Sequence, residues 1–402
     1  MVRIGIVAPI WLPDYGGGEQ YVDRLVRILQ DRLGAEIHIL TCSVSKGDGY
    51  AGVSQVPEDR VWRVDRGDFT NMIWESQWTL DFDSWFEEVD PEHIIFASPA
   101  TFNSGSIEHI SAVFDRLRQI GLNYGFVHYD LGFTTTRIHA QTLMAGGDWE
   151  DAREAFKLEV KTAQDSGSED AFNTDFEIPT VHRPDYLISC SQWSLDHLNP
   201  LNESAGFVFR PYMDFDHYAE SVEPFEGKRA SIGFVNPITH KGGHIAYNVA
   251  LADRDTSNLW LRGGYSNESK RRLMELVEPS IAAGECDLEI LDFVPDIRSF
   301  FASIDLLLFP SKFEGYGMVP VEAMACGVPV VSTNHPATVE GVGEGAFTLS
   351  PFDDSDTWSL AVEMVLEDRD EWVAKAAARV EELRDAQEIA VNDLIAFLQD
   401  FI

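Results

Sequence analysis

The sequence has few cysteines and no long apolar run. Its 402 residues include four cysteines, which lie far apart and form no Cys-x-x-Cys pair. This spacing argues against a structural zinc site and against a disulfide framework. No run of about 18 apolar residues appears, and the first strand-like stretch lacks the basic start and the cleavage site of a signal peptide. We therefore expect a soluble, unexported, cytoplasmic protein without stable membrane insertion.

Basic residues are scarce as well. The chain has 30 Lys and Arg against 67 Asp and Glu, so its formal net charge is −37 at pH 7. A field of this sign repels polyanions, which disfavours nucleic acids and anionic lipid surfaces as partners. Two interpretations of the acidity stay open. It is either a strongly hydrated surface, as in a salt-adapted host, or a means of attracting a cationic acceptor.

The apolar pattern predicts two α/β domains. Short runs rich in β-branched residues alternate with longer amphipathic segments, which is typical of βαβ units around parallel sheets. A chain of 402 residues also exceeds what one hydrophobic core usually supports. The rhythm restarts after residues 224–227, so we place one domain at residues 1–222 and a second at 228–385. The helical pattern of residues 386–402 predicts a C-terminal helix that packs back on the first domain.

The individual strands follow from the same runs. In the first domain we expect strands at residues 2–8, 36–41, 93–97, 124–128 and 186–189, and in the second at 231–235, 259–262, 288–291, 306–309 and 328–332. The stretch 131–179 is longer than the usual βα connection of about two to six residues. It is either an acceptor-binding insert or a helical surface elaboration with no binding role.

The segment from Asp305 to Ser332 carries most of the chemistry. A buried strand ends at Pro310, a glycine-containing turn follows, and a helix opens near Met318. Ligands bind at the C-terminal ends of such strands, and a helix N-terminus offers N–H groups to a diphosphate or to sugar hydroxyls. Glu314 precedes this helix and Glu322 lies within it. Their carboxylates can accept hydrogen bonds from sugar and ribose hydroxyls. Taken alone, however, the two residues favour the plainer interpretation of a helix-dipole partner and a solvated side chain.

The whole string decides between these interpretations. Pro-Ser before Glu314, and Glu-Ala-Met-Ala-Cys-Gly-Val-Pro-Val-Val from Glu322 onward, resemble the donor-binding motif of the family-four retaining glycosyltransferases, the glycosyl transferases of group 1. The resemblance implies the GT-B fold, in which two Rossmann-like domains face an interdomain cleft. It implies that the first domain binds a hydroxyl acceptor, such as a glycan, a lipid-linked sugar or a small molecule, and the second a nucleotide-diphosphate sugar. It also implies sugar transfer with retention of configuration, without a metal or any other cofactor.

The same resemblance assigns roles within the motif. Glu314 is expected to contact the donor sugar, and Glu322 the ribose hydroxyls. The residues between them are expected to help through the backbone: Gly315, Tyr316, Gly317 and Met318.

Other positions follow the order of the family. Gly17 and Gly18 come after the first strand and match its Gly-Gly-x-Glu loop, where glycine lets the backbone approach a ligand; a plain strand-to-helix turn is the alternative. His128 ends a strand where members often carry a histidine that faces the donor sugar; a structural histidine is the alternative. Val294 follows a strand whose end lies beside the nucleotide base in the family.

Lys241, in Lys-Gly-Gly, matches a family lysine that compensates the growing charge of the departing diphosphate. A surface lysine is the alternative. The arginine that the family places before this lysine is missing here. Asn236, Thr239 and Arg262 are candidates to share its task, so the phosphate clamp is only partly assigned.

Departures from the family pattern leave other functions open. Besides the missing arginine, residues 334–338 differ from the usual Gly-x-Pro-Glu. The chain is then either a glycosyltransferase, a catalytically impaired protein of the same fold that binds a sugar nucleotide, or another GT-B enzyme such as a sugar-nucleotide epimerase.

Overall fold

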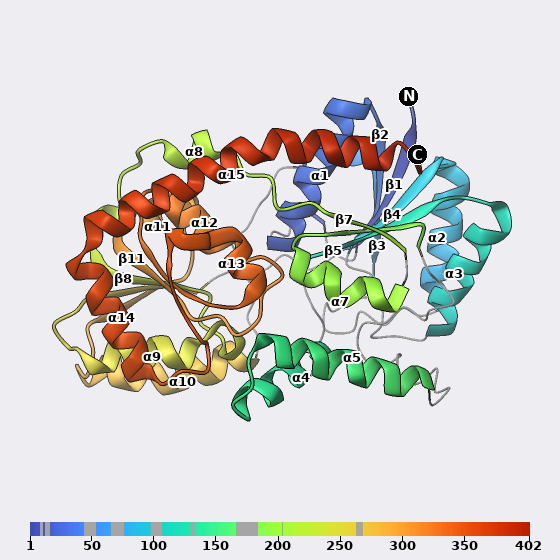
Figure 1. The fold of residues 1–402 in the computed structure, drawn as a ribbon. Helices are drawn as coiled ribbons and strands as arrows, with labels where there is room; N and C mark the ends of the chain where they lie inside the picture. The colour runs from blue at the N-terminus through green and yellow to red at the C-terminus, as the bar shows by residue number, and fades with distance from the viewer. Residues whose placement is uncertain are drawn as a thin grey trace. The chain divides into compact units, whose positions relative to one another are not determined.

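Figure 1 shows the computed structural model of the chain, which describes residues 1–8, 11–12, 17–43, 54–65, 76–97, 107–129, 133–165, 184–202, 204–262 and 268–402. The chain divides into two compact units. The first unit is Met1–Tyr212 together with Glu388–Ile402, and the second unit is Met213–Gln387. In the described part of the chain, no helix has both the length and the apolarity needed to cross a membrane.

A parallel sheet forms the centre of the first unit, with the strand order β3-β2-β1-β4-β5-β6-β7. Its strands are β1 (Arg3–Ala8), β2 (Glu36–Ser43), β3 (Val61–Asp65), β4 (His93–Ala97), β5 (Tyr124–His128), β6 (Tyr186–Ser189) and β7 (Ala205–Val208). Every strand predicted for this domain is present. The two that the sequence analysis missed, β3 and β7, are the edge strands. The side chains of β7 are partly or fully exposed, so its apolar signal is weak.

A second parallel sheet forms the centre of the second unit, with the order β10-β9-β8-β11-β12-β13. Its strands are β8 (Ala230–Val235), β9 (Asn258–Leu261), β10 (Leu288–Leu291), β11 (Ile304–Phe309), β12 (Val330–Thr333) and β13 (Phe347–Leu349). The missed strand is again a half-buried edge strand, β13. Both sheets are therefore of the Rossmann-like kind that the alternating pattern predicts.

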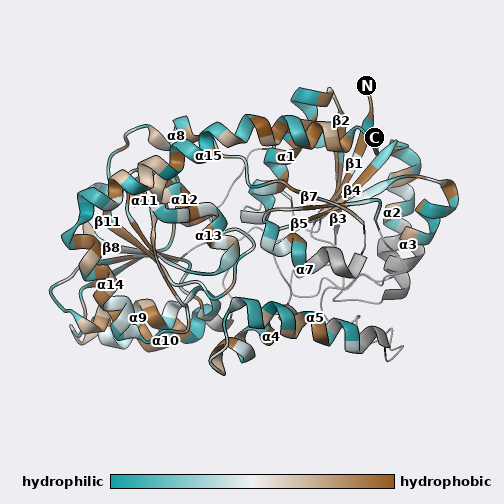
Figure 2. Cartoon of the chain, viewed as in Figure 1, coloured by the Kyte–Doolittle hydropathy of each residue, from teal (hydrophilic) through white to brown (hydrophobic). Residues whose placement is uncertain are grey.

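Helices flank both sheets. The first unit contains α1 (Gly17–Leu33), α2 (Ser76–Val89), α3 (Ile107–Ile120), α4 (Phe133–Met144), α5 (Trp149–Asp165) and α7 (Gln192–Asn202). The second unit contains α8 (Phe215–Ala219), α9 (Gly243–Ala252), α10 (Glu268–Ala282), α11 (Ile297–Phe301), α12 (Met318–Ala325), α13 (Pro336–Val342) and α14 (Ser355–Glu367), and α15 (Arg369–Leu398) begins in it. In the hydropathy colouring of Figure 2 many strand positions are brown and many helical positions are teal.

Each sheet has its own core. In the first unit, aromatic rings of α2, α3, β4 and β5 pack together, and the ring centroids of Phe96 and Phe114 lie 4.9 Å apart. In the second unit, α9, α10 and α14 pack on the sheet around the fully buried Trp260 and Trp358. The helices α11, α12 and α13 lie on the other side of that sheet (Figure 1).

The division between the units falls at residues 212 and 213, earlier than the predicted boundary. Residues 213–222, which the sequence analysis assigns to the first domain, therefore belong to the second unit. The reason is packing: Phe215 and Tyr218 of α8 are buried, and Arg298 donates hydrogen bonds to the His217 carbonyl at 2.8 Å and to Glu220 at 3.0 Å.

The last residues of α15, from Glu388 onward, belong to the first unit. The rings of Phe397 and Phe401 lie 5.7 and 4.8 Å from that of Tyr186 on β6. Asn123 donates a hydrogen bond to the Phe401 carbonyl at 2.9 Å. The C-terminus is thus tied to the first sheet by apolar packing and by a backbone contact.

Candidate functional site

The turn between β11 and α12 holds the predicted donor motif. Gly317 is the N-cap of α12 and has a φ of 81°, in the left-handed region that favours glycine. A β-carbon there would also lie 3.1 Å from the Thr338 side chain, so there is little room for one. Gly317 has no side chain that could cap the helix, and a helix N-terminus carries a partial positive charge that favours an anion. Gly315 and Tyr316 are buried beside it, and Met318 is half-buried.

Lys241 and Glu314 form an ion pair. The Lys241 ammonium donates a hydrogen bond to the Glu314 carboxylate at 2.5 Å, and the two side chains are 24% and 10% exposed. Two turns that lie 73 residues apart in the chain supply this pair. Gly242 lets the turn that carries Lys241 pack closely against the end of β11, because a β-carbon at this position would lie 2.2 Å from the carbonyl oxygen of Pro310. A cation and a carboxylate thus lie together close to the start of α12.

Glu322 is buried on α12, with 5% of its surface exposed. It accepts a hydrogen bond from the Tyr218 hydroxyl at 2.9 Å. Tyr218 comes from α8, 104 residues earlier in the chain, and the sequence analysis missed it. A five-residue helix with one tyrosine gives no periodic signal that could have identified this contact.

The other predicted residues of the second unit are spread along its sheet. Asn236 follows β8 with a φ of 61°, an uncommon conformation for a residue other than glycine. Val294 is buried, with 3% exposure. Arg262 is paired with the exposed carboxylates of Asp292, at 2.9 Å, and Glu278, at 3.6 Å. Its role in the phosphate clamp stays a prediction, and a ligand would have to compete with these two partners.

In the first unit, His128 ends β5 with its side chain buried. Burial lowers the pKa of the imidazole to about 3, so the ring is neutral at pH 7. Its Nε2 atom has no hydrogen-bond partner among the described residues, and neither has the hydroxyl of Ser189, its register partner on β6. Gly17 and Gly18 open α1, and a β-carbon on Gly18 would lie 2.3 Å from the Tyr129 ring.

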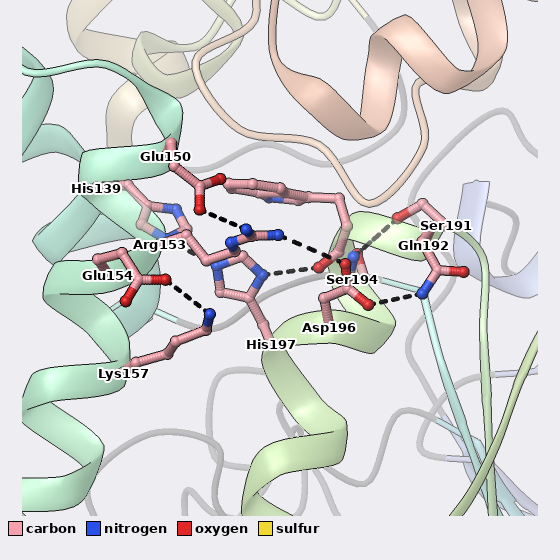
Figure 3. Close-up of polar contacts among 11 residues, drawn as sticks. His139, Glu150, Arg153, Glu154, Lys157, Ser191, Gln192, Ser194, Asp196 and His197 are labelled. Atoms are coloured by element: carbon pink, nitrogen blue, oxygen red, sulfur yellow. Dashed lines mark hydrogen bonds and ion pairs between the residues drawn. The ribbon is translucent and has the colours of Figure 1, made fainter.

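The described part of the predicted insert consists of α4 and α5, which pack against each other, with α5 also packing against α7. Figure 3 shows His139 of α4 facing His197 of α7, with their Nε2 atoms 3.1 Å apart. His197 donates from Nδ1 to the Trp193 carbonyl at 2.7 Å, so its Nε2 accepts a hydrogen bond from His139. Arg153 of α5 adds ion pairs to Glu150 and, at 3.7 Å, to Asp196. These contacts support a structural role for the two helices, and a role in acceptor binding stays a prediction.

Metal ligands are a separate question. Over the residues that the structure describes, no three His, Cys, Asp or Glu side chains come together as a metal-binding group. The expectation of a reaction without metal stays a prediction.

These two parallel-sheet units give the chain the GT-B fold of glycosyltransferases. Sucrose-phosphate synthase from Thermosynechococcus elongatus superimposes with a TM-score of 0.71 at 15% identity, over 100% of this chain and 99% of that one. HepE from Anabaena, solved in complex with UDP-glucose, superimposes with a TM-score of 0.67 at 15% identity over 100% of both chains. Residues 234–368 match the model of the glycosyl transferases group 1.

The curated sequence relatives are also named as glycosyltransferases, but they align over shorter stretches. O-antigen chain mannosyltransferase B from Escherichia coli is 30% identical over 158 residues, which is 39% of this chain and 40% of that protein. A D-inositol 3-phosphate glycosyltransferase from Paenarthrobacter aurescens is 41% identical over 51 residues, 13% of this chain and 12% of that protein. The chain thus aligns with less than half the length of either relative.

Proposed function

We propose that the protein is a retaining glycosyltransferase that moves a sugar from a nucleotide-diphosphate sugar to a hydroxyl acceptor without a metal ion. The observation that carries the proposal is the Lys241–Glu314 ion pair, with a 2.5 Å contact. Its carboxylate member, Glu314, comes three residues before the N-cap of α12, Gly317. A nucleotide sugar carries a diphosphate that needs a cation and hydroxyls that need carboxylates, and this pair offers both. The family match of residues 234–368 covers the same segment.

In the proposed reaction, the bond between the sugar and the diphosphate breaks with charge separation. Lys241 and the N-terminus of α12 stabilise the charge that develops on the departing diphosphate. Glu314 accepts hydrogen bonds from the sugar hydroxyls, and Glu322 from the ribose hydroxyls. His128, with a pKa of about 3, is a poor proton donor or base at pH 7. It orients the sugar through a hydrogen bond. The oxygen of the acceptor hydroxyl forms the new bond to the sugar carbon that the diphosphate leaves, and a phosphate oxygen of the departing diphosphate takes the hydroxyl proton.

A thermal-shift screen against UDP-, GDP- and ADP-sugars tests donor binding. The names of the relatives make hexose donors the first choice, since one is named a mannosyltransferase and a structural neighbour was solved with UDP-glucose. A ligand at 100 times its Kd stabilises the folded state by about 2.7 kcal/mol, which raises Tm by a few degrees. We expect such a shift with one class of donor, together with slow donor hydrolysis.

Three results would contradict the proposal. A thermal shift with NAD alone would show that the protein binds a dinucleotide and not a nucleotide sugar. Tight donor binding without turnover would favour a sugar-nucleotide-binding protein. Interconversion of the donor sugar in the absence of an acceptor would favour an epimerase.

A further inference from the structure

We propose that Tyr218 is a positioning residue that holds Glu322 for the ribose of the donor, an inference that rests on the function proposed above. The Tyr218 hydroxyl donates to the Glu322 carboxylate at 2.9 Å, and the two residues are only 8% and 5% exposed. A glutamate side chain has three rotatable bonds, so a hydrogen bond from a hydroxyl on a rigid aromatic ring restricts where its carboxylate lies. Precise placement of a binding group usually depends on such a supporting contact.

The backbone around Tyr218 is itself held in place. A helix of five residues has little stability of its own, so α8 needs outside contacts. The Asp214 side chain caps it, accepting from the His217 amide at 3.0 Å, and α8 packs against α12. Arg298 donates to the His217 carbonyl at 2.8 Å and to Glu220 at 3.0 Å, and Asp296 holds the other side of the guanidinium at 2.7 Å. The tyrosine is therefore fixed from two sides before it meets the glutamate.

Burial gives the hydrogen bond its value. A carboxylate that loses water needs donors, and a hydrogen bond to a charged group contributes more than one between neutral groups. If Glu322 accepts from the ribose, then Tyr218 and the ribose hydroxyls act on the same carboxylate. Removing the Tyr218 hydroxyl should therefore change how much a ribose hydroxyl contributes to binding, as interacting groups do in a double-mutant cycle.

The test is Tyr218→Phe, measured with the donor found in the screen and with its 2′-deoxy and 3′-deoxyribose analogues. Tyr247→Phe is the matched control, because Tyr247 is also 8% exposed in the second unit and its hydroxyl lies 2.7 Å from that of Ser280. We expect Tyr218→Phe to raise the Kd and KM of the normal donor roughly tenfold with kcat changed less than about twofold. Tyr247→Phe should leave both constants unchanged.

The decisive measurement is the coupling between the Tyr218 hydroxyl and the ribose hydroxyls. In the wild-type protein, loss of at least one ribose hydroxyl should weaken binding, and in Tyr218→Phe that penalty should shrink to a minor part of its original size. An equal penalty in both proteins, or an unchanged Kd in Tyr218→Phe, would overturn the positioning role while wild-type donor binding stands. A wild-type protein that binds no nucleotide sugar would instead overturn the proposed function and this inference together.

Discussion

Replacing Lys241 with alanine should lower kcat for sugar transfer by about 10² to 10³-fold, the usual effect of removing one group that stabilises transition-state charge. Lys241 lies 2.5 Å from Glu314, and we propose that it faces the leaving diphosphate. Its contribution grows as the bond to the sugar breaks, so kcat should fall more than donor affinity. Initial rates at saturating donor measure this, and an unchanged kcat would remove Lys241 from the mechanism.

A control must separate chemistry from folding. The alanine variant leaves the Glu314 carboxylate, which is 10% exposed, without its ion-pair partner, and this costs about 1–3 kcal/mol of stability. The double variant Lys241→Met with Glu314→Gln removes both charges, so it should regain Tm but stay inactive. Lys228→Ala is the matched control, because Lys228 is 23% exposed and bonds Glu289 at 2.6 Å in the same unit. It should keep the wild-type kcat.

Lowering the pH from 7 to 5 should strongly destabilise the first unit. Burial lowers the pKa of four of its histidines: to about 4 for His93 and His197, and to about 3 for His128 and His139. In the unfolded chain a histidine titrates near 6.5. Between these values the unfolded state binds more protons, so stability is present above pH 6.5 and is lost as the pH falls.

The expected size follows from the same linkage. Each such histidine contributes about 1.4 kcal/mol per pH unit, so four give roughly 5 kcal/mol per unit near pH 5, comparable with the whole stability of a domain. Urea midpoints read by circular dichroism at several pH values measure the slope. His139→Phe should reduce it by about a quarter. A stability that is flat from pH 7 to 5 would contradict the prediction.

The alternating pattern was enough to predict the central strands, because a strand buried on both faces is a continuous apolar run. It missed β3, β7 and β13, which lie at sheet edges. An edge strand has a neighbouring strand on one side only, so its residues need not form a continuous apolar run. The domain boundary was displaced for a related reason. The packing of α8 on the second unit depends on Arg298, more than 70 residues away, and no local pattern encodes such a contact.

The sequence by itself determined the class of protein and the motif with Glu314 and Glu322, since those residues lie in one continuous stretch whose turn and helix are local structures. Only the tertiary structure decided which groups meet there. It paired Lys241 with Glu314 across 73 residues and Tyr218 with Glu322 across 104. It also buried His139 against His197. Hydrogen bonds, burial and the pKa values that follow depend on neighbours in space, and the fold of the whole chain sets those neighbours.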